Sequence, residues 1–376
     1  MKNKTILILG GYGGTGRSLA HLLLKETTVN IVIAGRNESK AKSISDKLNL
    51  EFKGRVRSVY ADTSNITSLE NSFRKIDLVL FVTTSPQDVL NVAKTALKLN
   101  IDYLDVLFEQ STVEKLKQIE NEIKKKKRTF ITQAGFHPGL PAVLVRFAAK
   151  YFDNYDKAII GMAMNAKFEK PESTIDLINA ARDFDAIVCK EGKWRKANFK
   201  DIVTIDFGSR FGKRQCYPLK MEEMIKLPSI YGLKEAGVYA AGFNFIVDKI
   251  IFPLIFISHK IKKNSGTKLF QKLIYFGVNK LVSKEKGVVM VLKAQGKEKN
   301  KPLNLKLILE HEDGYLFTAA PIVACLKQYL KNKLPIGLGM MGQIVDEKRL
   351  FKDMENMGIK ISIGKMNNSN FLRISI

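Results

Sequence analysis

TILILGGYGGTGR, at residues 5–17, joins a short apolar run to a glycine-rich turn and the start of a leucine-rich segment. The run from Lys4 to Leu9 is bounded by glycines, as expected of a central parallel strand. After Gly10, the six residues from Gly11 to Gly16 fit the spacing G-x-G-x-x-G, and leucines at helical spacing follow. A strand, this glycine turn and a helix in that order predict a Rossmann half that binds the diphosphate of a nicotinamide dinucleotide.

Each glycine of this turn has an expected role. We expect Gly11 to permit the tight turn, Gly13 to let the backbone approach the diphosphate, and Gly16 to let the helix pack on the strand. The free N–H groups and the partial positive charge at the helix start then bind the phosphates. The other cofactor contacts expected in the turn are Tyr12, Gly14 and Thr15.

Strands and helices alternate up to about residue 135, which predicts an α/β fold with a doubly wound parallel sheet. Helical segments separate the strands, including one at residues 39–48 with Ser39 as its expected N-cap and one that begins at Pro86. The six expected strands are residues 4–9, 30–34, 56–60, 77–82, 102–106 and 128–132.

The end of the second strand selects the cofactor. NAD-binding domains place Asp or Glu there, whereas this chain has Arg36 and Asn37. The planar guanidinium of Arg36 suits a 2′-phosphate, and Asn37 can add a hydrogen bond to it. We therefore expect NADP, and NAD is the alternative if Arg36 only stacks on the adenine.

Further polar residues follow the carboxyl ends of other strands, where ligands of open α/β sheets bind. We expect Asp62 near the adenine amino group, and Thr83 and Thr84 along the path to the nicotinamide ribose. Asp105 and His137 are the titratable candidates for proton transfer. For each residue the alternative is a cap or turn role, and for His137 it is a solvated loop.

The turn-rich stretch QAGFHPGLP, residues 133–141, separates two regions of different pattern. We expect a Rossmann domain at 1–135, an α+β substrate or dimerisation domain at 136–330, and a C-terminal segment, 331–376, that packs back on the first domain. Residues 331–342 read as a loop. Tyr239 to Ser258 is apolar but contains Asp248 and Lys249, which disfavours a membrane span and favours a buried or interfacial helix pair.

Residues 239–263 join that apolar segment to the basic run HKIKK. Three interpretations stay open: peripheral contact with anionic lipid, a hydrophobic substrate pocket, or the interface of a homodimer. The whole chain has a formal net charge of +25, which attracts polyanions, although a genomic bias toward Lys codons explains it equally well.

Composition limits the other function classes. The chain has no zinc finger, RNP motif or aromatic-interleaved basic strand, so we expect a small-molecule substrate and no nucleic acid. Three widely spaced cysteines indicate neither a disulfide framework nor a metal site. They fit a reducing compartment, so we expect a cytoplasmic protein.

Several motifs together resemble the saccharopine dehydrogenase-like oxidoreductases. They are ILILGGYGGTGR, AGRN, IDYLDVLFEQ, AGFHPGLPA, HEDGYLFTAAPIVACL and LPIGLGMMGQIVD. The resemblance implies a Rossmann domain, an inserted α+β domain and a nicotinamide cofactor contacted by the glycine turn and Arg36. It also implies amino-acid-derived substrates. The apolar segment at 239–258 is closer to family members that associate with lipid.

The sequence thus predicts an NADP-dependent oxidoreductase that transfers hydride to or from an amino-acid-derived or lipid-like substrate. No Tyr-x-x-x-Lys pair follows the fourth strand, which disfavours short-chain dehydrogenase chemistry. The alternative function is a dinucleotide-binding redox sensor or membrane-associated scaffold without turnover.

Overall fold

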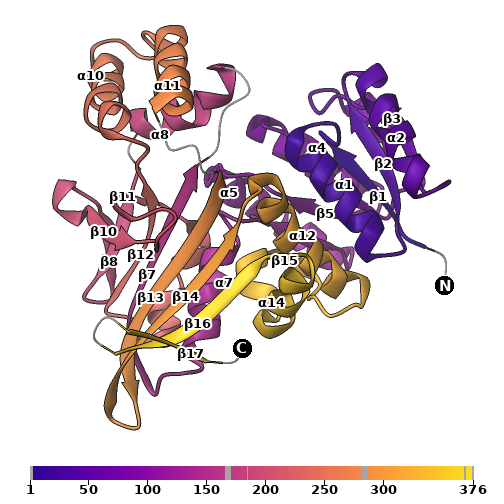
Figure 1. Ribbon diagram of the computed structural model, residues 1–376. Coiled ribbons are helices and arrows are strands. Elements are labelled where there is room, and N and C mark those ends of the chain that lie inside the picture. Colours follow the sequence, from indigo (N-terminus) through magenta and orange to yellow (C-terminus); the bar gives the residue numbers. More distant parts are fainter. Residues whose placement is uncertain (1–2, 166–170, 184, 282–285, 368–369, 375–376) are drawn as a thin grey trace. The chain divides into compact units, whose positions relative to one another are not determined.

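A computed structural model describes residues 3–165, 171–183, 185–281, 286–367 and 370–374 (Figure 1). The chain divides into two compact units. The first contains Met1–Phe147, Met221–Met224 and Tyr315–Ile359, and the second contains Ala148–Lys220, Ile225–Gly314 and Lys360–Ile376. The chain therefore passes between the units several times.

The described residues of the first unit form a seven-stranded parallel sheet in the order β15-β6-β5-β4-β1-β2-β3. β1 is central, with Ile6 paired to Ile31 of β2 on one side and to Leu78 of β4 on the other. The order reverses between β1 and β4, and such a switch point is where open α/β sheets bind ligands. The strands are β1 (Thr5–Leu9), β2 (Asn30–Gly35), β3 (Val56–Tyr60), β4 (Leu78–Phe81), β5 (Asp102–Asp105), β6 (Thr129–Thr132) and β15 (Gly337–Met340).

Both faces of this sheet are buried, because consecutive residues of β1 from Ile6 to Leu9 are at most 1% exposed. Leu7 and Leu9 pack in a core cluster with residues of α3, α4, α5 and α6. The helices are α1 (Gly14–Glu26), α2 (Glu38–Glu51), α3 (Ile66–Ser72), α4 (Val89–Lys98), α5 (Ser111–Lys117), α6 (Glu120–Lys125), α7 (Leu140–Ala149), α12 (Gly314–Leu330), α13 (Met341–Ile344) and α14 (Glu347–Asn356), with short 3-10 turns η1 (Pro86–Asp88) and η4 (Glu222–Met224).

The described residues of the second unit form a mixed sheet of ten strands, mostly antiparallel. Its main path is β10-β11-β12-β7-β13-β14-β16-β17, and two of its hairpins close with two-residue turns of positive φ, Glu191-Gly192 and Lys299-Asn300. The strands are β7 (Asn154–Asn165), β8 (Ile187–Lys190), β9 (Lys193–Lys196), β10 (Val203–Asp206), β11 (Lys213–Leu219), β12 (Glu235–Ala241), β13 (Gly287–Glu298), β14 (Lys301–His311), β16 (Lys360–Asn367) and β17 (Asn370–Ile374).

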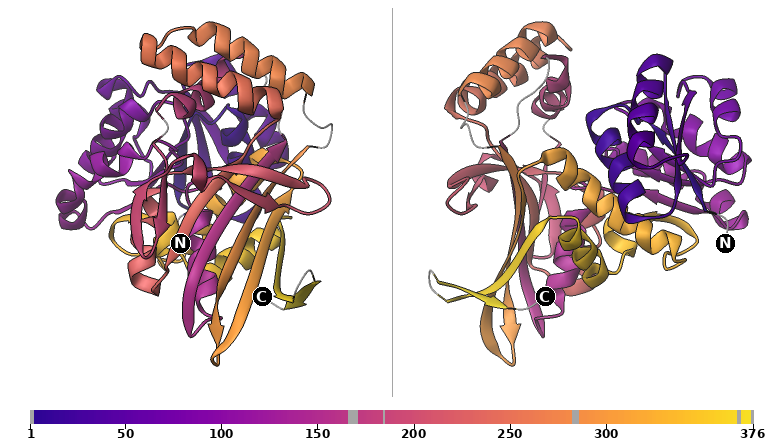
Figure 2. Two further views of the ribbon diagram at one scale, coloured as in Figure 1. Left: turned by 90° about the vertical axis from the view of Figure 1, so that its left-hand side faces the viewer. Right: turned by 45° about the vertical axis from the view of Figure 1, so that its right-hand side comes forward.

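Helices of the second unit gather mainly beyond one end of its sheet, where α10 and α11 lie side by side with α8 (Figures 1 and 2). These helices have a small core of their own, which includes Ile178, Ile251 and Ile274. The elements are α8 (Ile175–Asp183), α9 (Leu227–Tyr231), the π-helix η5 (Val247–Ile251), α10 (Phe252–Ile261) and α11 (Thr267–Leu281), with 3-10 turns η2 (Pro171–Thr174) and η3 (Phe199–Asp201).

Expectation and structure differ in the last part of the chain. Residues 331–342 are not only a loop, because β15 adds a seventh strand parallel to β6, with Gly337 paired to Thr129. The segment after residue 331 does not return whole to the first unit. From Lys360 onward it belongs to the second, where Leu309 of β14 pairs with Ile361 of β16.

The apolar stretch 239–258 also differs from the expected helix pair. Tyr239 is in β12, buried and paired with Gly161 of β7, so the stretch begins as a strand. The helical part starts only at Phe245, passes into η5 at Val247 and continues through α10. In the described residues no helix has both the length and the apolar character needed to cross a bilayer.

Candidate functional site

The glycine turn follows β1 and leads directly into α1. The left-handed residue is Gly10, with φ +83°, so it and not Gly11 supplies the tight turn. Gly16 packs against that turn, since a methyl group added there would lie 2.3 Å from the carbonyl oxygen of Gly10. Only glycine at residue 16 therefore lets α1 begin this close to the strand.

The amino terminus of α1 has the features of a phosphate-binding site. Gly13 is its N-cap residue and provides no side chain to cap the first turn, which also contains no acidic residue. The amide groups from Gly14 onward are thus not occupied by a side-chain acceptor, and the helix dipole favours an anion there. A dinucleotide diphosphate suits this helix start, because the glycine at its N-cap leaves the first amide groups without a side-chain partner of their own.

Two tyrosine rings border the turn. A methyl group at Gly14 would lie 2.5 Å from the ring of Tyr315, which comes from the first turn of α12. Tyr12 lies against the end of β2, where its hydroxyl accepts a hydrogen bond of 3.3 Å from the backbone N–H of Asn37. The sequence singled out Tyr12 but not Tyr315, which only the tertiary fold brings to this turn.

The carboxyl end of β2 presents Arg36 to solvent beside Asp62. Hydrogen bonds from the side chain and backbone of Ser64 lower the pKa of Asp62, and the charge of Arg36 lowers it further. Asn37 caps α2 with its side-chain oxygen, which accepts a 2.8 Å hydrogen bond from Lys40 N–H. The cap is therefore Asn37, not Ser39.

Two threonines follow β4, next to the switch point. The side chain of Thr83 lies close to Gly10. A Cβ atom added to Gly10 would be 3.1 Å from the methyl carbon of Thr83. Its hydroxyl oxygen is buried and has no hydrogen-bond partner in the described part of the chain. Thr84 is exposed. A buried hydroxyl without a partner beside the glycine turn is suited to a ligand contact.

Asp105 ends β5 and has no exposed surface. Burial raises its pKa to about 6, although nearby Thr132 and Tyr103 and two backbone N–H groups oppose the rise. Its Oδ1 accepts hydrogen bonds from Leu107 N–H at 3.2 Å and Gln133 N–H at 3.1 Å. The carboxyl group thus joins the ends of β5 and β6.

Gln133, directly after β6, is a buried non-glycine residue in the left-handed region, with φ +53°. Its side-chain nitrogen donates to Gln110 at 2.9 Å, while its Oε1 is buried without a partner among the described residues. Strained backbone and an unsatisfied polar atom are features that concentrate at ligand sites.

His137 is held by aromatic rings and is not the solvated loop residue considered from the sequence. Its ring lies edge-on to Phe136 at 4.2 Å and to Phe108 at 5.8 Å, centroid to centroid. Burial lowers the pKa of His137 to about 4, so the imidazole is neutral at pH 7. Its Nδ1 is buried, whereas the residue as a whole keeps part of its surface exposed.

Glu223 is a buried acid that the sequence did not single out. It belongs to the first unit, where its Oε1 accepts a 2.7 Å hydrogen bond from Gly139 N–H at the start of α7. Burial raises the pKa of Glu223 to about 8, against hydrogen bonds from the backbone of Gly139 and Ala142. It therefore fixes the turn that follows His137 from a distant segment.

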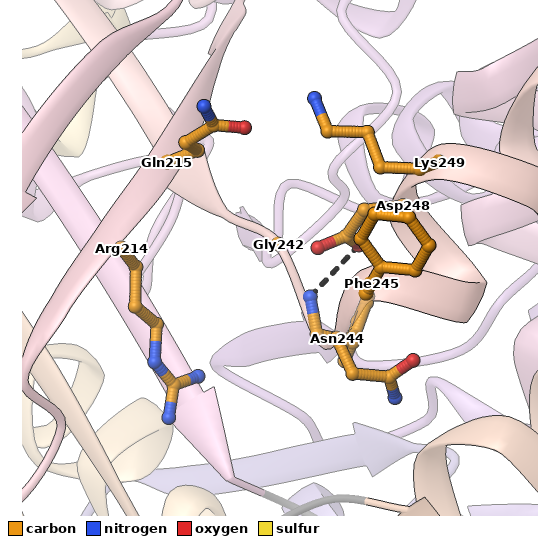
Figure 3. Close-up of a pocket in the computed structure, with 8 residues that line it drawn as sticks. Arg214, Gln215, Gly242, Asn244, Phe245, Asp248 and Lys249 are labelled. Carbon is orange, nitrogen blue, oxygen red and sulfur yellow. Dashed lines mark hydrogen bonds between the residues drawn. The ribbon is translucent and has the colours of Figure 1, made fainter.

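The second unit has an open pocket of about 290 Å³. Arg214 and Gln215 of β11 lie on one side, with Asp248 and Lys249 of η5 on the other (Figure 3). Arg214 is half-buried, and its guanidinium donates to two neutral oxygens, those of Phe211 at 3.0 Å and Asn165 at 2.9 Å. The pocket is lined by Arg214, Gln215, Gly242, Phe243, Asn244, Phe245, Asp248 and Lys249.

The fold thus brings the residues selected from the sequence to one edge of the first sheet. The glycine turn, Arg36, Asp62 and Thr83 follow β1, β2, β3 and β4, while Asp105 and the loop of His137 follow β5 and β6. Carboxyl ends of parallel strands share one edge of a sheet. Asp105 differs from the expectation in being wholly enclosed.

Comparison with known proteins agrees with this geometry. Residues 6–133 match the model of a family described as saccharopine dehydrogenase NADP binding domain. Carboxynorspermidine synthase of Vibrio cholerae is 27% identical over 248 residues, which are 58% of this chain and 58% of that relative. The matched region therefore spans little more than half of the relative's length.

A solved structure covers nearly the whole chain. Apo saccharopine dehydrogenase (L-Glu forming) from Saccharomyces cerevisiae matches with a TM-score of 0.69 and 13% identity, over 97% of this chain and 100% of that one. Identity this low shows the fold alone. The chain therefore has the fold of saccharopine dehydrogenase, and its residues 6–133 match the NADP-binding domain described for that family.

Proposed function

We propose that this protein is an NADP-dependent oxidoreductase that acts on the C–N bond of a carboxylated amine. The observation that carries the proposal is the uncapped, acid-free start of α1 packed on the glycine turn of an NADP-binding domain. One relative is a carboxynorspermidine synthase, and the structural match is an L-Glu-forming dehydrogenase. Both names describe products that contain amine nitrogen and a carboxylate, which supports this substrate class.

The start of α1 and the end of β2 support the following cofactor contacts. The amides of Gly14, Thr15 and Gly16 would hold the diphosphate, and the guanidinium of Arg36 would bind the 2′-phosphate. Thr83 offers its buried hydroxyl to the nicotinamide end. When bound, NADPH supplies a hydride to the carbon of a C=N bond, and the nitrogen gains a proton to give the amine.

His137 is our candidate for exchanging the proton at the substrate nitrogen. It is neutral at pH 7 and keeps part of its surface exposed, so it can accept a proton in the oxidative direction and return it in the reductive one. Asp105 is wholly enclosed, and we assign it a positioning role through its hydrogen bond to Gln133 N–H.

The test is a screen for cofactor-dependent turnover. Purified protein with NADPH is mixed with pairs of amines and carbonyl compounds, one member of each pair carrying a carboxylate, and absorbance of the reduced nicotinamide is followed. Carboxylated secondary amines with NADP⁺ test the reverse direction. Turnover of carboxylated pairs, and not of matched pairs without a carboxylate, is the expected result. Tight NADPH binding without turnover of any pair would instead support the non-catalytic sensor.

A further inference from the structure

The helical hairpin of the second unit, residues 243–281, exposes an unusual amount of apolar surface. It contains nine of the 20 large apolar side chains that are exposed in the described part of the chain. On the first helical arm they recur at helical spacing, at Ile246, Ile250, Leu254, Ile257 and Ile261. Contiguous exposed apolar surface of this kind marks an interaction site.

The second arm, α11, exposes a matching stripe. Leu269 is 59% exposed and Phe276 58%, with Leu273 between them. The arms run antiparallel, because a methyl group at Gly277, near the end of α11, would lie 2.7 Å from Val247, at the start of the first arm. The hairpin is thus closed by contact between its two ends.

Both stripes turn to the same side of the hairpin. On each arm the exposed stripe precedes the buried one by one residue, as Ile250 precedes Ile251 and Leu273 precedes Ile274. One residue is about 100° around a helix. In each helix the exposed stripe is therefore rotated from the core-facing side by the same angle and in the same sense along the chain. For two antiparallel helices packed on one core, this places both stripes on the same side of the hairpin. The two stripes thus form one apolar band.

Lysines border this band along α11. Lys268 and Lys272 precede Leu269 and Leu273 by one residue, so they stand on the side of the stripe away from the core. On the first arm Lys249 precedes Ile250 by one residue, but its Nζ lies 5.9 Å from the ring centroid of Tyr217 in β11. Residues 243–281 contain seven lysines and a single acidic residue, Asp248.

We propose that this apolar band docks on the surface of a membrane containing anionic lipid, with the hairpin axis lying in the membrane plane. An apolar band flanked by cationic side chains matches the layering of the interface, where acyl chains lie below anionic headgroups. The long lysine stems lie along apolar surface with their charge in the headgroup layer. Lys260 already rests over the ring of Phe256, with Nζ 4.5 Å from its centroid.

The charge disfavours a second copy of this chain as the occupant. In a symmetric dimer the same patch meets itself, so the lysine rows of the two copies would be brought together. Like charges facing each other across an interface are costly, whereas an anionic surface neutralises them. Docking does not require bound cofactor, so it stands apart from the proposed reaction.

The test is vesicle binding by the full chain. Vesicles of phosphatidylcholine alone are compared with vesicles containing about 30% phosphatidylserine, a content typical of an anionic surface. We expect sedimentation with the anionic vesicles, weakened by added salt. A variant with Ile257→Glu and Phe276→Glu, one change on each arm, should bind about tenfold more weakly or worse.

Matched variants separate the band from general surface effects. Phe199→Glu with Ile230→Glu changes two exposed apolar residues of the same unit outside the hairpin and should bind as the wild type does. Lys268→Glu with Lys272→Glu should weaken binding to anionic vesicles about thirtyfold or more, at about one kcal/mol for each lysine near the surface.

Three outcomes would overturn the proposal. The first is equal binding to neutral and anionic vesicles, or no binding to either. The second is an equal loss of vesicle binding in the control variant with Phe199→Glu and Ile230→Glu. The third is a dimer in sedimentation velocity that the Ile257 and Phe276 changes convert to monomer, because the band would then be a self-interface. Unchanged thermal unfolding and NADPH affinity of each variant show that the fold and the proposed cofactor site are intact.

Discussion

Replacing Gly16 with alanine should separate α1 from the glycine turn. The added methyl group would lie 2.3 Å from the carbonyl oxygen of Gly10 and 2.8 Å from the Cα of Gly11, both backbone atoms that no rotamer change can move. Ordinary contact begins at 3.4 Å, so the helix start must shift by about 1 Å. Overpacking of this kind costs about 1–3 kcal/mol.

Because the diphosphate depends on amides at that helix start, we expect the cost to appear in cofactor affinity. A loss of about 1–3 kcal/mol corresponds to roughly a 5- to 150-fold rise in Kd for NADPH, measured by calorimetric titration. Gly54→Ala is the control. Its φ of +73° makes alanine unfavourable, but nothing lies within 4 Å, so it should lose stability without losing affinity. Wild-type affinity in Gly16→Ala, or an equal loss in Gly54→Ala, would refute the reasoning.

Three further predictions concern single side chains. Arg36→Asp should shift the ratio of NADPH to NADH affinity toward NADH by about tenfold or more, because a charge-assisted hydrogen bond contributes about 1.5–3 kcal/mol. Unchanged relative Kd values for the two dinucleotides would show that Arg36 does not bind the phosphate. His137→Gln should lower kcat about 100-fold or more with the Kd for NADPH unchanged. The wild-type kcat should show no titration of His137 from pH 5 to 8, because the pKa of His137 is about 4. A variant with the kcat of the wild type would contradict the proposed role of His137. The pKa of Glu223 is raised to about 8 from its ordinary 4.5. Its contribution to the free energy of unfolding is therefore fully present below pH 4.5 and is lost as the pH rises to 8. Glu223→Gln should therefore gain unfolding free energy relative to wild type by up to about 5 kcal/mol over that range in urea titrations; a constant difference between pH 5 and pH 8 contradicts it.

The nucleotide-binding half was predictable because its signals are local. An apolar run with both faces buried, a glycine turn and helical leucine spacing fall within residues 5–24, and the order of strands follows from repeating that unit. The bounds of β3 agree with the expected 56–60. The left-handed glycine was misplaced by one residue, because the spacing motif does not reveal that Gly10 makes the turn.

Pairing between distant segments was not predictable in this way. β15 is short and glycine-containing, and only its pairing with β6 makes it a strand. Tyr239 lies in β12, which ends at Ala241, and the apolar continuation of that strand reads as helix. A buried β-strand and a buried helix have the same composition over a few residues.

The site residues that the sequence missed share one property. Glu223 reaches Gly139 and Tyr315 reaches Gly14 from segments that no local motif connects to those positions. Gln133 was quoted only as part of a turn-rich stretch, although an amide side chain in left-handed backbone after a strand is itself a signal of constraint. The enclosure of Asp105 depends on both neighbouring strands and could not be read from its position alone.

The central claim is that the amide groups at the start of α1 and the guanidinium of Arg36 together bind a phosphorylated nicotinamide dinucleotide. Calorimetric titration of the full chain with NADPH, and separately with NADH, measures this directly. We expect saturable binding of one NADPH per chain, with NADH at least about tenfold weaker. Absence of heat with both dinucleotides at high protein concentration, or tighter binding of NADH, would contradict the claim.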